Sequence, residues 1–420
     1  MRILFKDFRI VDIDNDFCGS IVVENGFIKE VCNNDTDVSG VSVVIDGRGF
    51  SSSTVLMPAF IDLHAHFRES GFPEKETSFP KETLESASLA AVAGGFVTAV
   101  CMANTSPVID SLDKVLCVRN RSGNLGLIDL YPVLSLTKNM DGQELSDVKK
   151  LSENNSSGLK LPLMISEDGK DVADDNLFLE AMTEAKRLGI PVSCHCDFYG
   201  DESKSVRRVI ELGKKAGCHI HIAHVSTKET VEIIREEKKQ KTADNGFFLS
   251  CEATLHHIGA TEEDAQRMGD KSYGRVNPSL SSEENRQVVI AALKDGTIDA
   301  IATDHAPHSE KDKAAGSPGF VGLETAFAVC FSNLSVNLNQ LSALMSANPA
   351  WIIGLKDRGR IKEGLRADLV IADTKAEWPV LPEKFKSRGK CTPFANKVLK
   401  GKILMTINAG KIVFDGGANV

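Results

Sequence analysis

Short apolar runs alternate along this chain with longer segments whose apolar residues recur at helical spacing. Residues 55–61, 97–102, 192–194 and 298–303 are short and largely apolar, which predicts buried strands. Residues 81–93 and 177–188 predict helices that precede two of those strands. Repeated strand and helix units are typical of an α/β fold, and a (β/α)8 barrel gathers the C-terminal ends of its strands at one mouth.

The two ends of the chain have a different pattern. Residues 2–55 and 359–416 are typical of short strands, with turns at Asn25-Gly26 and Asp46-Gly47. The 420 residues also exceed a minimal barrel of about 250 residues. We therefore expect a barrel over residues 56–356 and a small composite β-sandwich domain built from residues 1–55 and 357–420.

Histidines and a carboxylate follow several of the predicted strands. His64 and His66 are two residues apart, so they face the same way at a strand end. Alone, such a pair could equally be two core or surface histidines. His195, His224 and Asp304 each follow a further apolar run, however, and imidazole with carboxylate is a ligand set suited to zinc. The pattern predicts a metal centre at the barrel mouth.

Several motifs around these residues match one enzyme family. Residues 58–69, PAFIDLHAHFRE, and 302–308, ATDHAPH, resemble the two signatures of the dihydroorotases, which belong to the amidohydrolase superfamily. Residues 224–229 and 318–325 also resemble that family, and the likeness extends over nearly the whole chain. It implies a TIM-type barrel with a β-sandwich. It also implies the reversible cyclisation of N-carbamoyl-L-aspartate to (S)-dihydroorotate in de novo pyrimidine (UMP) biosynthesis.

The resemblance also implies roles for the candidate ligands. His64 and His66 would hold the more buried of two zinc ions together with Asp304, and His195 and His224 would hold the more exposed one. Zinc can lower the pKa of water to about 7 and polarise an amide oxygen. Asp304 would take the proton of the attacking hydroxide and pass it to the leaving nitrogen, as general base and then acid.

A second group of residues is expected to bind the substrate. Dihydroorotate carries a carboxylate, and the planar guanidinium of Arg68 can bind it through two parallel hydrogen bonds. By resemblance, Asn104 and His308 share that carboxylate. Asn277 and the backbone around Pro318-Gly319 would contact the amide edges of the ring.

Two residues compete as the ligand that bridges the metals. Lys160 is the lone cation of an apolar run, and its carboxylation by carbon dioxide would make a bridging carbamate. This segment resembles the dihydroorotase domain of the animal multifunctional pyrimidine-synthesis protein. Asp168, in Ser166-Glu167-Asp168-Gly169, instead resembles the bridging loop of the common bacterial enzymes. We favour Lys160, because the run between His195 and His224 is short, as in the animal domain; Lys160 could also simply extend out of a barrel strand.

Composition limits the remaining possibilities. A net charge of −9 argues against a nucleic-acid surface, and no apolar stretch approaches the roughly 20 residues of a membrane span. Ten cysteines without paired spacing, and no apolar segment typical of a signal peptide, predict a cytoplasmic protein. The expected assembly is a homodimer, with possible association with aspartate carbamoyltransferase.

Two alternative functions stay open at this point. Another cyclic amidohydrolase, such as a hydantoinase, dihydropyrimidinase or allantoinase, would share the metal scaffold, but Arg68 and Asn104 argue against substrates that lack this carboxylate. The other alternative is a non-catalytic dihydroorotase-like partner protein, which would be expected to lack ligands that are present here.

Overall fold

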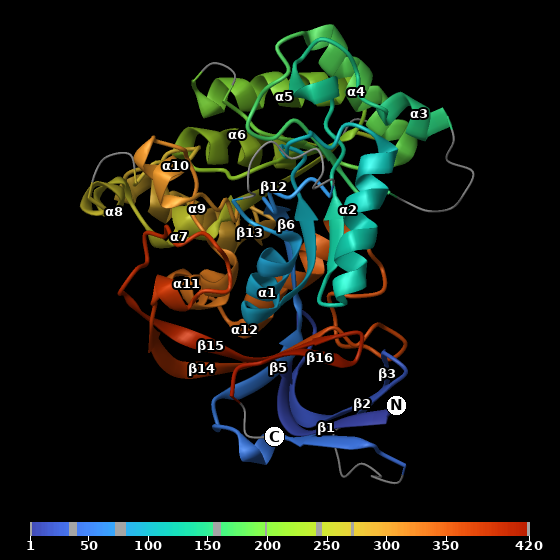
Figure 1. The fold of residues 1–420 in the computed structure, drawn as a ribbon, viewed down its shortest axis with the longest axis vertical. Helices are drawn as coiled ribbons and strands as arrows, with labels where there is room; N and C mark the ends of the chain where they lie inside the picture. Colours follow the sequence, from blue (N-terminus) through green and yellow to red (C-terminus); the bar gives the residue numbers. More distant parts are fainter. Residues whose placement is uncertain are drawn as a thin grey trace.

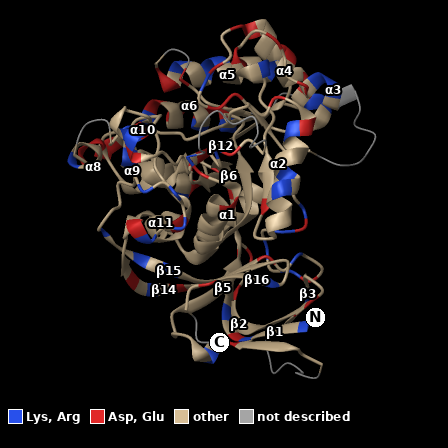
Figure 2. Cartoon of the chain, viewed as in Figure 1, with Lys and Arg blue, Asp and Glu red and all other residues tan. Residues whose placement is uncertain are grey.

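The computed structural model describes residues 2–32, 40–71, 81–153, 161–197, 200–240, 246–269 and 273–417. An α/β part fills the upper two thirds of Figure 1, and a β-rich part lies below it. Basic and acidic residues are intermixed along the outer helices drawn in Figure 2. None of the helices in these ranges has the length and apolar character needed to cross a membrane.

The α/β part is a closed barrel. Parallel pairing joins three strands in one sheet and five in another. Parallel bridges from Leu134 to Ile165 and from Ala65 to His305 join the two sheets at both edges, so the ring closes. Its strands are β6 (Phe60–Ala65), β7 (Phe96–Cys101), β8 (Asp129–Pro132), β9 (Ile165–Ser166), β10 (Val192–Cys194), β11 (His219–Ile222), β12 (Phe248–Thr254) and β13 (Ala300–Ala302). The predicted barrel architecture is confirmed.

Helices alternate with these strands and cover the barrel. The longer ones are α1 (Leu84–Ala93), α2 (Leu112–Leu125), α4 (Asp175–Leu188), α5 (Glu202–Ala216), α6 (Lys228–Lys239), α9 (Glu283–Asp295) and α11 (Ala326–Leu334). Shorter ones are α3 (Val148–Glu153), α7 (Leu255–Gly259), α8 (Glu262–Arg267), α10 (Glu310–Ala314), α12 (Leu338–Ser342), the π-helical turn η6 (Ala343–Ala347) and α13 (Asn348–Ile352).

Capping residues set where these helices begin and end. The Asp174 side chain accepts hydrogen bonds from the first backbone N–H groups of α4, and Gly189 ends that helix with a φ of 65°. Thr83 and Ser86 form a capping box that begins α1 at Leu84. The helix therefore begins three residues later than its apolar pattern predicted.

The β-rich part combines strands from both ends of the chain in one eight-stranded sheet, ordered β16-β15-β14-β5-β1-β2-β3 with β4 paired to β1. Blue N-terminal and red C-terminal strands lie together in Figure 1, and β5 pairs antiparallel with β14. The strands are β1 (Arg2–Val11), β2 (Asp16–Glu24), β3 (Phe27–Cys32), β4 (Val43–Asp46), β5 (Thr54–Pro58), β14 (Leu369–Pro379), β15 (Val398–Asn408) and β16 (Lys411–Asp415).

This sheet has its own hydrophobic core, to which β1, β2, β3, β5, β14 and β15 all contribute. Strand β1 turns at Asp7, with a φ of 55°, and its register with β2 shifts there. As a result, its first half pairs with β4 and its second half with β5. Hydrogen bonding thus defines one curled sheet, and the two-layer sandwich stays a prediction.

The passage from sheet to barrel differs from the predicted boundary between residues 55 and 56. That boundary falls inside β5, which belongs to the sheet, and the barrel begins with β6 beyond Ala59. Every residue of β5 and β6 is buried, so the hydrophobic pattern of the sequence shows no boundary between the two strands. Backbone pairing, rather than composition, separates the two strands.

Candidate metal centre and active site

The predicted ligands meet at the C-terminal ends of the barrel strands. His64 lies near the end of β6 and His66 follows it; His195 follows β10, His224 follows β11 and Asp304 follows β13. All five side chains are buried. The backbone φ is 38° at His224 and 42° at Asp304, a region that non-glycine residues rarely adopt. The chain therefore turns sharply where these side chains enter the site.

Asp168 completes the cluster two residues beyond β9. Its Oδ1 lies 3.2 Å from His64 Nε2, and its Oδ2 lies 3.5 Å from His66 Nε2. The same Oδ1 lies 3.5 Å from His195 Nδ1 and 3.8 Å from His224 Nε2. Asp168 thus belongs to two groups of three donor atoms, each within 4.8 Å, and is the member that both groups share.

Asp304 lies at the edge of this cluster. Its Oδ1 is 3.0 Å from His66 Nε2 and 3.6 Å from His64 Nε2. His64 Nε2 itself is buried and has no hydrogen-bond partner in the described part of the chain, although two carboxylates face it. A divalent cation would satisfy such a nitrogen and such carboxylates together. The donor set therefore fits a metal site.

Both carboxylates are held in the ionised form. Burial opposes ionisation of Asp168, but the charge of His64 and hydrogen bonds from His195 and His224 outweigh it, so the pKa of Asp168 lies well below its ordinary value. Burial likewise opposes ionisation of Asp304, yet the hydrogen bond from His66 and the charge of His64 lower its pKa. Both groups can therefore act as anionic ligands.

Behind His64 lies a buried hydrogen-bonded chain. His64 Nδ1 is 2.9 Å from Oε1 of Glu252 on β12, whose Oε2 is 3.1 Å from His221 Nε2. His221 Nδ1 in turn lies 2.8 Å from Ser250 Oγ. Burial opposes ionisation of Glu252, but hydrogen bonds from His221 and His64 lower its pKa to about 2. Sequence reasoning missed Glu252; its signal was the polar alternation of Ser250, Glu252 and Thr254 within a buried strand.

The expected substrate-binding groups Arg68, Asn104 and His308 also lie together. Arg68 Nη1 is 3.3 Å from Asn104 Oδ1, and Arg68 Nη2 is 3.4 Å from His308 Nε2. Asn104 Oδ1 is also 2.9 Å from His66 Nδ1, which links this group to the metal ligands. Arg68 Nε is buried and has no hydrogen-bond partner among the described residues. An anionic ligand could satisfy it.

His308 is neutral in this environment. Burial and then the positive charges of Arg68, Lys81 and Lys313 lower its pKa to about 3. Its Nδ1 lies 3.2 Å from Lys81 Nζ, and its Nε2 donates to the carbonyl oxygen of Pro318 at 2.8 Å. Sequence reasoning did not single out Lys81, because a surface lysine before a helix carries no signal of its own.

Asn277 lies beside the candidate ligand His195, and the Pro318-Gly319 segment lies beside His308. Asn277 Nδ2 is 3.1 Å from His195 Nε2. The ammonium of the buried Lys313 donates to the carbonyl oxygens of Arg275, Ser317 and Gly319 at 2.9, 3.0 and 3.0 Å. Lys313 thereby holds the two segments together.

The structure brings together every predicted site residue that it describes. Lys160, the favoured bridge, lies outside the described residues. The barrel strand at this position is β9, which is formed by Ile165–Ser166, and Asp168 follows its C-terminal end as the other candidate ligands follow theirs.

Comparison with known proteins agrees with this geometry. The model of the amidohydrolase family matches residues 55–413. A dihydroorotase from Clostridium botulinum is 39% identical and covers 99% of this chain and 100% of its own length. A dihydroorotase from Aquifex aeolicus is 34% identical, with 99% of both chains covered. These matches show that the chain belongs to the amidohydrolase family and, within it, to the dihydroorotases.

Solved structures show the same fold. An L-hydantoinase from Arthrobacter aurescens superposes with a TM-score of 0.83 at 24% identity, covering 99% of this chain and 96% of that one. A dihydropyrimidinase from Brevibacillus agri gives a TM-score of 0.82 at 17% identity, covering 99% and 95%. At these identities the likeness concerns the fold alone.

Proposed function

We propose that this site interconverts N-carbamoyl-L-aspartate and dihydroorotate in pyrimidine biosynthesis. The observation that carries the proposal is the placement of Arg68, Asn104 and His308 beside the metal donors. Arg68 Nη1 and His66 Nδ1 lie within 3.3 Å and 2.9 Å of the same oxygen of Asn104. A substrate held by its carboxylate at Arg68 would therefore present its amide to the donor cluster.

Two divalent ions, of which zinc is the best match to histidine and carboxylate ligands, would occupy the cluster. His64 and His66 would hold one ion and His195 and His224 the other, with Asp304 completing the first. When bound, such ions lower the pKa of water and polarise an amide oxygen.

The chain's own residues would then move the proton and hold the substrate. Asp304 is ionised at neutral pH, so it can accept the proton of the attacking water and deliver it to the ring nitrogen. Arg68 holds the carboxylate through its fork, while Asn277 and the backbone of Pro318-Gly319 contact the amide edges. The reverse sequence of proton transfers closes the ring.

We further propose that Asp168, rather than Lys160, bridges the ions. Both oxygens of Asp168 face histidine nitrogens, and Oδ1 faces one from each pair. This geometry favours the alternative that the sequence ranked second. The preference for Lys160 depended on a closer resemblance to the animal domain than to the common bacterial enzymes. That resemblance stays a prediction.

The bridge can be tested by paired substitutions. Asp168→Ala should lose metal and activity together, while Lys160→Ala should keep both, as should Asp171→Ala, which removes a nearby carboxylate outside the donor set. If Lys160 is the carboxylated bridge, Lys160→Ala will instead lose both, and short carboxylic acids added with zinc should restore activity. Metal content by mass spectrometry and turnover of dihydroorotate distinguish the two patterns.

The reaction itself is tested by substrate comparison. The purified protein should open dihydroorotate and close N-carbamoyl-L-aspartate, and should be much slower with hydantoin, dihydrouracil and allantoin, which lack the carboxylate. Faster turnover of hydantoin would favour a hydantoinase instead. No turnover of any of them by the metal-loaded protein would favour a non-catalytic partner.

The expected assembly is a proposal of the same kind. Aspartate carbamoyltransferase produces N-carbamoyl-L-aspartate, so a cytoplasmic homodimer that associates with it would receive substrate directly. Light scattering of this chain alone and mixed with that enzyme would reveal both the dimer and the association.

A further inference from the structure

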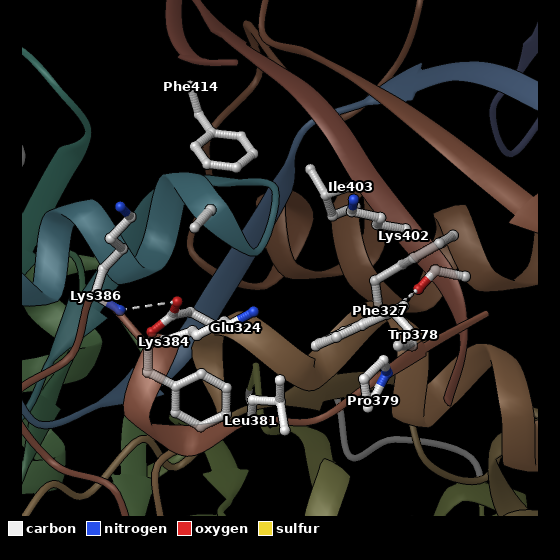
Figure 3. Close-up of a pocket in the computed structure, with 14 residues that line it drawn as sticks. Glu324, Phe327, Trp378, Pro379, Leu381, Lys384, Lys386, Lys402, Ile403 and Phe414 are labelled. Atoms are coloured by element: carbon white, nitrogen blue, oxygen red, sulfur yellow. Dashed lines mark hydrogen bonds between the residues drawn. The ribbon is translucent and has the colours of Figure 1, made fainter. Parts of the chain in front are cut away.

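A cavity of about 340 Å³ lies between the barrel helices and the C-terminal strands (Figure 3). Helix α11 contributes Phe327, and the C-terminal strands contribute Trp378, Lys402 and Phe414. None of its lining residues belongs to the metal donors or to the substrate-binding groups. The volume falls in the range of about 300–1,000 Å³ that is typical of small-molecule sites.

Aromatic side chains form much of the wall. Phe327, Trp378, Phe385 and Phe414 all line the cavity. Trp378 is fixed by a hydrogen bond of 2.8 Å from its Nε1 to the carbonyl oxygen of Gly401. Gly401 has a φ of 97°, and a Cβ there would lie 3.0 Å from the Phe327 ring, so glycine permits this close packing. The Phe327 ring itself is buried and stacks with Phe60 and Phe331. The partly exposed rings of Trp378, Phe385 and Phe414 are therefore the flat surfaces that the wall offers to a ring.

Three exposed lysines surround these rings. In Figure 3, Lys384 and Lys386 lie on the side of the segment that follows β14, and Lys402 lies opposite them on β15. Within the described ranges, none of the three ammonium groups has an ion pair, although the chain as a whole carries a net charge of −9. Lys386 acts only electrostatically on the nearby Glu324 carboxyl. Three cations around an apolar cavity are complementary to an anion.

One carboxyl group, that of Glu324, also lines the cavity. Its two oxygens accept hydrogen bonds from the backbone N–H groups of Lys386 and Ser387 at 3.0 and 3.1 Å. Burial raises its pKa to about 7, so it is only partly ionised at neutral pH. The lining consequently keeps an excess of positive charge.

We propose that this cavity binds a small molecule that joins a flat aromatic ring system to an anionic group. The partly exposed rings of Trp378 and Phe414 contact the ring system, and Lys384, Lys386 and Lys402 surround the anion. This site is separate from the proposed reaction, so neither proposal depends on the other.

Two dyes of similar shape and different charge test the proposal. The probes are 1-anilinonaphthalene-8-sulfonate, an aromatic anion, and N-phenyl-1-naphthylamine, which lacks the sulfonate. The chain has two tryptophans, so Trp351→Phe leaves Trp378 as the only tryptophan reporter. In the metal-loaded protein, the sulfonate should bind one molecule per chain and quench Trp378 emission, with at least about tenfold higher affinity than the neutral dye, as expected for three added charge contacts.

Charge-removal variants complete the test. Lys384→Ala, Lys386→Ala and Lys402→Ala should each weaken sulfonate binding about two- to fivefold, as expected for exposed ionic contacts. Lys29→Ala removes the same charge from the remote strand β3 and should change nothing. Equal affinity for the two dyes, equal behaviour of all four variants, or sulfonate binding without quenching of Trp378 would each overturn the proposal.

Discussion

Nδ1 of His64 lies 2.9 Å from Oε1 of Glu252, on the opposite side of the imidazole ring from Asp168, which lies 3.2 Å from Nε2. Glu252 therefore keeps a proton on Nδ1, so a cation that displaces the proton of Nε2 meets a nitrogen that is already oriented. We expect Glu252→Gln to weaken metal binding about 10- to 100-fold, because the partner of a ligand histidine contributes its charge as well as its geometry.

Competition with a chelator would measure this loss. Glu377→Gln, on the exposed part of β14, is a control that changes the same charge without touching the site. His221→Gln should reproduce part of the effect, because it removes the imidazole from the second oxygen of Glu252. Wild-type metal affinity in Glu252→Gln would mean that packing alone orients His64.

Substitution of Arg68 by lysine should mainly affect substrate binding. Lysine keeps the charge but loses the fork, so KM for dihydroorotate should rise about tenfold while kcat changes less. Steady-state kinetics of Arg68→Lys beside Arg235→Lys, a partly buried control outside the site that is paired with Asp295, would measure this. An unchanged KM would remove Arg68 from the carboxylate site.

Asp304→Asn should abolish both ring opening and ring closure in a folded protein. The amide cannot accept a proton from water and is a weaker ligand, so kcat should fall by more than the roughly 10²- to 10⁴-fold typical of acid and base catalysis alone. Turnover in both directions, with circular dichroism to check folding and Asp295→Asn as the exposed control, tests this. Near-normal turnover would exclude Asp304 as the base.

Glu324 should make stability depend on pH. Burial, opposed by its backbone hydrogen bonds, raises its pKa from 4.5 to about 7. The folded state therefore binds this proton more tightly than the unfolded state, so the stabilisation is complete below pH 4.5 and is lost as the pH rises to about 7. The loss from this group should reach up to about 3 kcal/mol.

Urea unfolding of the metal-free protein between pH 4.5 and about 7 would measure how steeply the free energy of unfolding falls with pH. Glu324→Gln should flatten this dependence, whereas Glu383→Gln, which changes an exposed residue of the same segment, should leave it as in the wild type. Identical slopes in all three proteins would show that the Glu324 carboxyl titrates normally.

Much of the barrel and of the candidate site could be predicted, because both follow from simple geometry. Parallel strands place their C-terminal ends at one mouth, so His195, His224 and Asp304 had to converge once their apolar runs were identified as strands. Arg68, Asn104 and His308 were expected on family motifs, and the structure places Asn104 Oδ1 and His308 Nε2 3.3 and 3.4 Å from the Arg68 guanidinium.

What could not be predicted depends on contacts between distant residues. Glu252 has a role in the site only because β12 places its carboxylate within hydrogen-bonding distance of His64 and His221. The choice between Lys160 and Asp168 depends on where the short strand β9 begins, and two paired residues are too few to leave a hydrophobic pattern. The boundary inside β5 was hidden for the opposite reason, since every residue on both sides of it is buried.

The pairing of β5 with β14 has a consequence for the making of the protein. The ribosome synthesises β5 early, but its partner strand β14 begins only at Leu369. Until the ribosome has synthesised most of the chain, one edge of β5 has no native partner, and unpaired strand edges invite pairing with other chains. A chain released before β14 would contain all the candidate metal ligands. It would nevertheless expose the unpaired edge of β5, where other chains could pair and aggregate. Pairing with β14 therefore covers the open edge of β5 only in a chain that has been synthesised past Leu369.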